Sequence, residues 1–201
     1  MSLQKINEKL RQILLEMCEE DLRVREKLAG TGELFDGYCP KMEKVHLENA
    51  AELERMIEQN KGKWLGKSMV GDDGAEAAWL IVQHAISLPD FLRKCLKLLE
   101  TAVNENGAEP QHFAHLADRI AFFERRPQKY GTQSDWNADG KMQIWTLENA
   151  EKVNEYRASV RLNPLKKLIW ETDETDKNTP KNFDERQKEA QDWLKKTGWR
   201  K

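Results

Sequence analysis

The sequence has few cysteines, and their spacing predicts no crosslink. Cys18, Cys39 and Cys95 are odd in number, widely separated and without a CxxC pair. A disulfide framework needs paired cysteines, and a cysteine-based zinc site needs closely spaced ones. The sequence therefore predicts neither.

Long hydrophobic runs are also missing. No stretch approaches the roughly 18 apolar residues that a membrane-spanning helix needs. The first residues, MSLQKINEKLRQILLEM, are amphipathic and lack the uninterrupted apolar segment and small-residue cleavage site of a secretory signal. We therefore expect no membrane association and a cytoplasmic location.

Neither sign of charge dominates, and the familiar nucleotide motifs are absent. The chain has 33 basic and 35 acidic residues and a net charge of -2. A nucleic-acid-binding protein needs a basic face to neutralise phosphates, so we expect no nucleic-acid partner. Without a GxGxxG, P-loop or GxSxG motif, the sequence indicates no cofactor and no serine-hydrolase chemistry.

Charged residues, by contrast, are abundant. They make up 34% of the chain, against about 25% in an average domain, and the mean hydropathy is -0.82. The core must therefore come from narrow apolar stripes on charged helices. We predict a mainly α fold, a helical bundle of about six to eight helices with one short β-hairpin after the helix that ends near Arg125.

Apolar residues recur at steps of three and four along most of the chain, which is typical of amphipathic helices. Residues 30–46 contain Gly37, Pro40 and few periodic positions, so we predict a loop there. The predicted helices cover residues 3–29, 47–60, 75–85, 89–103, 110–125 and 147–160.

One gap interrupts the apolar stripe of the first predicted helix. Between Met17 and Val24, the inward positions are occupied by Glu20 and Asp21. Either this face lies at a partly wet edge of the core, or a carboxylate points toward a group that favours a negative charge.

The second half of the chain changes its pattern. Asp139-Gly140 between two short aromatic-containing runs predicts the hairpin. Residues 171–182 contain no apolar side chain, and we predict a polar linker there. We expect residues 1–170 to form the helical domain, and residues 183–201 to form an amphipathic C-terminal helix that docks either on that domain or on a partner.

The most informative feature is Gln83-His84 at the end of a helix that is apolar almost all round, with Trp79 alongside. Burying a hydrogen-bonding side chain without a partner costs several kcal/mol. Either both side chains bond to loop backbone, or polar groups converge on them and form a pocket. In such a pocket His84 would act as a base, oriented by Asp118 or Asp21.

The helix over residues 110–125 carries His112, His115, Asp118 and Arg119, and the last three can share one flank. The HxxH spacing differs from the HExxH of zinc enzymes, so we predict no metal site there. Asp118 and Arg119 form either a structural ion pair or part of a catalytic site.

A run of hydrogen-bonding residues precedes the hairpin, and its Gly131 permits close backbone approach. This run either caps the helices as a turn or forms a polar lip over the pocket of His84. Its residues are Tyr130, Gly131, Thr132 and Gln133.

Four blocks of sequence resemble an uncharacterised bacterial domain family of unknown function. In order they are GKSMVGDDGAEAAWLIVQHA, PDFLRKCLKLLETAV, HLADRIAFFERRPQKYGTQ and NAEKVNEYRASVRLNPLKKL. The resemblance covers about residues 62–168 and implies a shared polar pocket. The residues that it implies for this pocket are Trp79, Gln83, His84, Asp118, Arg119, Tyr130, Gly131, Thr132 and Gln133.

Two classes of function fit these features. The first is a small-molecule-binding or hydrolytic helical domain with a polar pocket around His84. The alternative is a non-enzymatic protein that neutralises or regulates a protein partner. For the first class, the catalytic candidates are His84 and Asp118, and the ligand-binding candidates are Trp79, Gln83, Arg119, Tyr130, Thr132, Gln133 and Asp21.

Overall fold

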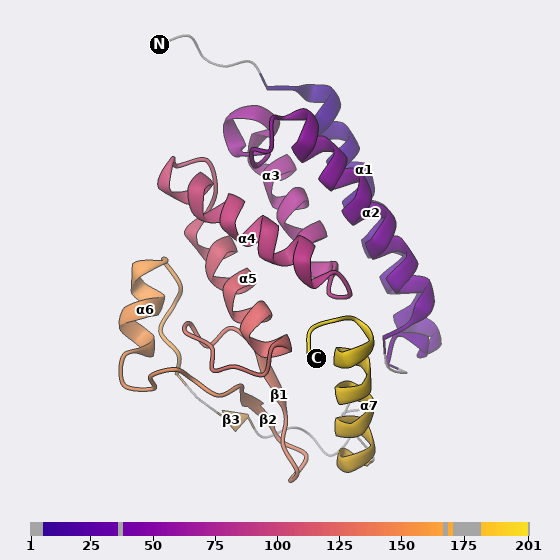
Figure 1. Cartoon of the computed structure of the whole chain (residues 1–201), viewed down its shortest axis with the longest axis vertical. Helices are drawn as coiled ribbons and strands as arrows, with labels where there is room; N and C mark the ends of the chain where they lie inside the picture. Colours follow the sequence, from indigo (N-terminus) through magenta and orange to yellow (C-terminus); the bar gives the residue numbers. More distant parts are fainter. Residues whose placement is uncertain (1–5, 36–37, 167–168, 171–181, 201) are drawn as a thin grey trace. The chain divides into compact units, whose positions relative to one another are not determined.

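The structure is a computed structural model that describes residues 6–35, 38–166, 169–170 and 182–200. The chain divides into two compact units, Met1–Glu109 and Pro110–Lys201 (Figure 1). The predicted mainly α class is confirmed. That residues 1–170 form one domain stays a prediction, and the predicted linker over residues 171–182 lies outside the described residues except for Asn182.

The described part of the first unit contains helices and their connecting loops, and no strand. Its elements are α1 (Glu8–Thr31), the short 3-10 helix η1 (Glu33–Phe35), α2 (Pro40–Gln59), α3 (Lys67–His84) and α4 (Pro89–Asn104). Helix α1 packs against α2 and α3, and α3 packs against α4. The largest fully buried apolar side chains of this unit are Leu14, Met42, Leu53, Met56, Ile57, Leu65, Ile81, Leu92 and Leu99.

The predicted loop over residues 30–46 is wrong in its second half, because α2 already begins at Pro40. Proline is well suited to the first turn of a helix, where its missing N–H has no partner to lose. The inward face of this first stretch carries Met42, His46 and Asn49, all of them buried. Two of these three are polar, so the apolar periodicity that marks a helix is hidden there.

Helix α3 is interrupted near its start and then runs through the centre of the unit. Gly71 has φ 74° and ψ 173°, which breaks the helical backbone after one turn. Arg11 of α1 donates from Nε and Nη2 to the two carboxylate oxygens of Asp73, at 2.8 and 2.6 Å. This pair ties α1 to α3 beyond the break, and the buried part of α3 ends at His84.

The second unit combines helices with a small sheet. Its elements are α5 (Pro110–Phe123), β1 (Ser134–Trp136), β2 (Met142–Ile144), α6 (Val153–Ser159), β3 (Ile169–Trp170) and α7 (Phe183–Lys196). The sheet order is β1-β2-β3, with Trp136 opposite Met142 and Met142 opposite Trp170, both antiparallel. The predicted hairpin is therefore confirmed, and β3 adds a third strand that the sequence pattern did not indicate.

The C-terminal helix packs within its own unit. Gly198 adopts φ 83°, and the N–H of Trp199 donates to the carbonyl of Leu194 at 2.9 Å. This turn brings Trp199 onto Phe123 of α5, with ring centroids 5.2 Å apart, and Trp193 lies 5.6 Å from the same ring. The helix therefore contacts α5 within the Pro110–Lys201 unit, and its docking on the predicted domain over residues 1–170 stays a prediction.

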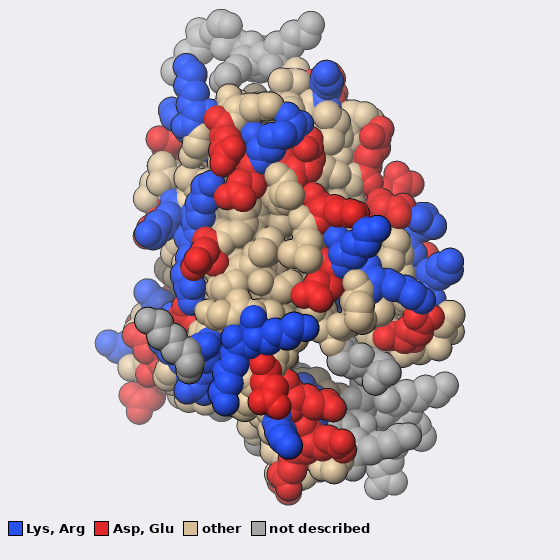
Figure 2. Space-filling model, turned by 45° about the vertical axis from the view of Figure 1, so that its right-hand side comes forward, with Lys and Arg blue, Asp and Glu red and all other residues tan. Residues whose placement is uncertain are grey.

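The surface carries both signs of charge. On the face shown in Figure 2, basic and acidic side chains are mixed around an uncharged area. None of the described helices is both long enough and apolar enough to cross a bilayer.

Candidate functional site

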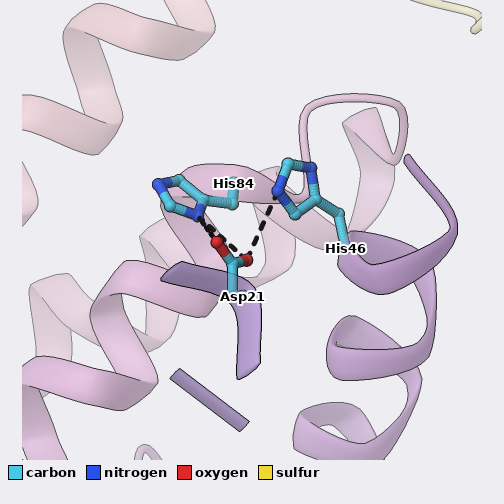
Figure 3. A group of neighbouring side chains, drawn as sticks. All are labelled: Asp21, His46 and His84. Atoms are coloured by element: carbon cyan, nitrogen blue, oxygen red, sulfur yellow. Dashed lines mark hydrogen bonds and ion pairs between the residues drawn. The ribbon is translucent and has the colours of Figure 1, made fainter. Parts of the chain in front are cut away.

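Three ionisable side chains from three helices meet in the first unit. Figure 3 shows the carboxylate of Asp21 (α1) between the rings of His46 (α2) and His84 (α3). His84 Nδ1 lies 2.9 and 3.0 Å from the two oxygens of Asp21, and His46 Nε2 lies 3.3 Å from Oδ2. One ligand atom from each residue lies within 4.8 Å of the other two. We call this group the Asp21 cluster.

The position of Asp21 explains the gap in the apolar stripe of α1, which we attributed either to a wet edge of the core or to a carboxylate that points at a favourable group. Its exposed fraction is 1%, so it does not lie at a wet edge. Glu20 is the residue at the edge, where its carboxylate pairs with Arg23 on the same exposed surface. The carboxylate of Asp21 instead points at two imidazoles, which favour its negative charge.

The electrostatics of Asp21 are set by opposing effects. Burial by itself raises the pKa of a carboxyl group, because it penalises the charged form. Here the close contacts of the carboxylate with the two histidine rings outweigh burial, and they hold the pKa of Asp21 well below its usual range. The carboxylate is therefore ionised at neutral pH, and the buried negative charge needs a proton or a cation beside it.

His46 is held in place by Tyr38. The Tyr38 hydroxyl lies 2.7 Å from His46 Nδ1, and the two rings stack with centroids 5.8 Å apart. Burial raises the pKa of Tyr38, so the phenol stays protonated. In the tautomer in which Nδ1 of His46 carries the proton and donates to the phenol oxygen, Nε2 carries no proton and its lone pair faces Asp21.

The Nε2 atom of His46 makes a close contact with Asp21 but no well-formed hydrogen bond. It is buried, and among the described residues it has no hydrogen-bond partner of good geometry, although it lies 3.3 Å from Asp21 Oδ2. The His46 and His84 rings are 5.1 Å apart between centroids. Two imidazole nitrogens and one carboxylate oxygen thus point at one small volume.

The surroundings of the cluster are partly fixed and partly open. Asn49 Nδ2 donates to the backbone carbonyl of Met17 at 3.2 Å, which joins α2 to α1 one turn away. Burial raises the pKa of Cys18, and the charges of Asp21 and Glu76 raise it further. The thiol therefore stays protonated. The side chain of His84 is 18% exposed, whereas those of Asp21 and His46 are 2% and 6% exposed, so His84 forms the open side.

Among the predicted site residues, the structure brings His84 into contact with Asp21. The sequence offered Asp118 or Asp21 as the acid that orients His84, and the observed hydrogen bond is made by Asp21. Gln83 is buried beside His84 on α3, and Trp79 is half-buried one turn earlier on the same helix.

Asp118 lies in the second unit and organises the segment before the hairpin. Its two oxygens accept from the backbone N–H groups of Lys129, Tyr130 and Thr132 at 2.9 to 3.1 Å, and from the Thr132 hydroxyl at 3.0 Å. Burial raises the pKa of Asp118, and these hydrogen bonds oppose it. The carboxylate therefore holds a loop, and its predicted ion pair with Arg119 stays a prediction. A catalytic role for Asp118 likewise stays a prediction.

The rest of that segment is fixed in the same way. Gln128 Nε2 donates to the Gln133 carbonyl at 2.8 Å, and Gln128 Oε1 accepts from the Gln133 N–H at 2.9 Å. Arg157 donates to the Tyr130 carbonyl at 2.7 Å. Gly131 has φ 65° in this tight turn. Tyr130 is buried, and the predicted polar lip over His84 stays a prediction.

The remaining polar residues of α5 lie on that helix as the sequence pattern predicted. His112 is buried, and His115 and Arg119 are half-buried. Burial lowers the pKa of His115, and Arg119 lowers it further. His115 is therefore neutral at pH 7, and a ligand-binding role for Arg119 stays a prediction.

Sequence reasoning missed two members of the site, His46 and Tyr38. Both fall in the segment predicted to be a loop, so neither was placed on a helix face. The signal was present: Pro40 is a good first-turn residue, and Met42, His46, Asn49 and Leu53 follow at helical steps. Read as a helix, this face presents a histidine inward.

A family model described as a family of unknown function (DUF6624) matches residues 8–176, which includes the whole Asp21 cluster. No curated protein matches the chain. No solved structure matches it either.

Proposed function

Since the chain belongs to DUF6624, a family of unknown function, we propose its function from the geometry of its own residues. Asp21, His46 and His84 bind a divalent transition metal, and the domain uses that centre to hydrolyse a small-molecule substrate. The observation that carries this proposal is the buried Nε2 of His46, which faces the Asp21 carboxylate without a well-formed hydrogen bond.

The donor set suits such an ion. Imidazole nitrogen and carboxylate oxygen are common ligands of zinc and of non-haem iron. Histidine ligands usually have a second group that fixes the other ring nitrogen, and Tyr38 does this for His46. A divalent cation would also balance the buried negative charge of Asp21.

Among the described residues the cluster offers three protein ligands, and this number supports a catalytic centre over a structural one. Structural zinc sites use four protein ligands, whereas catalytic ones use three and leave a position for water or substrate. A metal ion bound there would supply a water whose pKa is lowered toward neutrality. Asp21 and His46 would hold the buried side, and the partly exposed His84 would face the substrate.

The first test is metal binding by the full chain, with a matched set of variants. The metal-free protein is titrated calorimetrically with Zn²⁺, Mn²⁺ and Co²⁺. We expect binding of one ion, weakened by about 10- to 100-fold in Tyr38→Phe, which loses only the supporting contact. His46→Ala and His84→Ala should lose more than that. His115→Ala is the control, because this histidine belongs to the second unit.

Two results would contradict the metal proposal. One is a folded wild-type protein that binds none of the three ions. The other is binding that His46→Ala and His115→Ala weaken equally, since the ion would then not be held by the cluster.

A second candidate uses the same residues without a metal. The bond from His84 Nδ1 to both oxygens of Asp21 would fix the ring so that Nε2 acts as a general base. Hydrolytic activity that survives complete chelation and is lost in Asp21→Asn would support this candidate over the first.

Both candidates include a small-molecule ligand and no nucleic acid, and we place the protein in a bacterial cytoplasm, where its three free cysteines stay reduced. The alternative class is a neutralising or regulatory protein whose C-terminal amphipathic helix docks on a partner. Its support is weaker because Trp193 and Trp199 pack against Phe123.

A further inference from the structure

A second charged group lies in the Pro110–Lys201 unit and shares no residue with the Asp21 cluster. Arg125 follows α5, and its side chain is only 12% exposed. Its guanidinium lies over the rings of Phe122 and Trp145, 5.2 and 5.1 Å from their centroids. These aromatic faces fix the plane of the guanidinium and shield it from water.

The acid nearest to Arg125 is already used by another arginine. Asp135 of β1 is buried, and its Oδ1 accepts from Arg186 of α7 at 2.6 Å and from the Trp136 N–H at 2.9 Å. Arg125 Nη1 is 3.9 Å from Asp135 Oδ2, which is an ion pair without a hydrogen bond. Among the described residues, one carboxylate therefore stands between two guanidiniums, and these three side chains together carry a net positive charge.

Several donors of these two arginines remain unused. Nε and Nη1 of Arg125 and Nη1 of Arg186 are buried and have no hydrogen-bond partner among the described residues. Burial lowers the pKa of Arg125, Asp135 opposes this, and the charges of Arg186 and Arg200 lower it further. A buried guanidinium stays charged, so its unmade hydrogen bonds are costly.

We propose that Arg125 and Arg186 form a binding site for a small oxyanion, a phosphate or carboxylate group, which accepts hydrogen bonds from these unused donors. The planar fork of an arginine matches two oxygens of either group. Asp135 holds Arg186 in position without neutralising the pair. The aromatic rings around Arg125 lower the local dielectric and strengthen the attraction.

The location of the site makes it independent of the Asp21 cluster. All residues of the anion site belong to the second unit. An experiment that disproves anion binding would therefore leave the proposal of a metal centre unaffected. The family model ends at residue 176, so it includes Arg125 and Asp135 but not Arg186. The anion site is therefore a property of this chain that the family match does not carry.

The test is a titration of the full chain with inorganic phosphate and, separately, with acetate, at neutral pH. Sodium chloride keeps the ionic strength constant, so that general screening does not contribute. We expect a saturable rise in Tm with at least one of the two anions. Arg186→Gln should weaken that binding by about tenfold or more, the usual effect of losing a charge-assisted hydrogen bond.

Two further variants test whether the effect is specific to these two arginines, and an NMR spectrum detects anion binding directly at Arg125. Arg126→Gln removes the neighbouring exposed arginine and should bind as the wild type does. Arg125→Lys keeps the charge but loses the fork, and should bind more weakly. In ¹⁵N spectra of the folded wild type, the Nε–H signal of Arg125 should shift with the bound anion, and this measurement does not depend on how well any variant folds.

The proposal is overturned if neither anion gives a saturable change in Tm or in the Arg125 signal of the folded wild type. It is also overturned if Arg126→Gln weakens binding as much as Arg186→Gln does. Preference for phosphate over acetate would identify phosphoryl compounds as the ligand class, and the reverse would identify carboxylic acids.

Discussion

Asp21 is an acid whose surroundings are nearly all provided by residues distant in sequence. Its contact with His84 spans 63 positions, so nothing in the local pattern of α1 indicates it. Sequence reasoning could identify His84, because an imidazole at the end of an apolar helix needs a polar partner. It named Asp21 as one of two acids, and only packing of α1 on α3 distinguishes that acid from Asp118.

The depressed pKa of Asp21 predicts a pH dependence of stability. The unfolded chain binds a proton on this residue near pH 3.9, whereas the native protein does so only at lower pH. The stabilisation from Asp21 is therefore complete above about pH 4 and is lost as the pH falls below that value.

Urea unfolding of the metal-free protein at a series of pH values, compared with Asp21→Asn, measures this contribution. We expect the wild type to be more stable than the variant near neutral pH, and the difference to shrink below about pH 4. A difference that stays constant down to pH 3 would show that Asp21 has an ordinary pKa in the native protein.

At the scale of elements, patterns based on apolar periodicity located most helices, and the Asp-Gly turn located the hairpin. They failed at the start of α2, where the inward positions are His46 and Asn49. A method that relies on apolar periodicity predicts a loop where a helix has polar side chains on its buried face. Here His46 belongs to the Asp21 cluster, and Asn49 joins α2 to α1 beside it.

The segment before β1 offers a test of one element in isolation. Gly131 has φ 65°, and a Cβ there would lie 3.2 Å from Leu147 Cδ2 and 3.4 Å from Leu165 Cδ2. A left-handed backbone costs a residue with a side chain about 1–2 kcal/mol, and the crowding adds to this.

Gly131→Ala should therefore lower the free energy of unfolding by at least about 1–2 kcal/mol, measured by urea denaturation. Gly30→Ala is the matched control, because a Cβ at that position in α1 meets nothing within 4 Å. Alanine there should leave the stability unchanged or raise it by up to about 1 kcal/mol. Equal effects at both positions would contradict the strain assigned to the turn.

At the scale of the whole molecule, the chain places its two candidate sites in different units. The Asp21 cluster uses α1, α2 and α3, and the Arg125 site uses the end of α5, β1 and α7. Composition predicted a charged helical protein, but the division between Glu109 and Pro110 has no sequence signal beyond a short loop with Gly107 and Pro110. Contacts between distant segments define the units, and a single sequence does not contain them.

The division predicts where a bound metal would stabilise the protein. At a free ion concentration 100 times the Kd, binding slows opening of the structure that contains the site by about a hundredfold. Hydrogen exchange followed by mass spectrometry should show this protection in α1, α2 and α3. Amides of α5 and α6 should exchange as before, and His84→Ala should abolish the effect. Uniform protection of both units would contradict a local site.

The three members of the Asp21 cluster come from successive long helices, with a complete connection between each pair. An ion coordinated by all three would close two loops of the chain at once, as crosslinks do in proteins that rely on disulfides. It would restrict the conformations open to the denatured chain. The three thiols of this protein are free and form no disulfide. The coordinated ion would therefore act as a reversible crosslink between the helices of the first unit. Removing the ion with a chelator would then act on the fold as reduction acts on a disulfide-bonded domain.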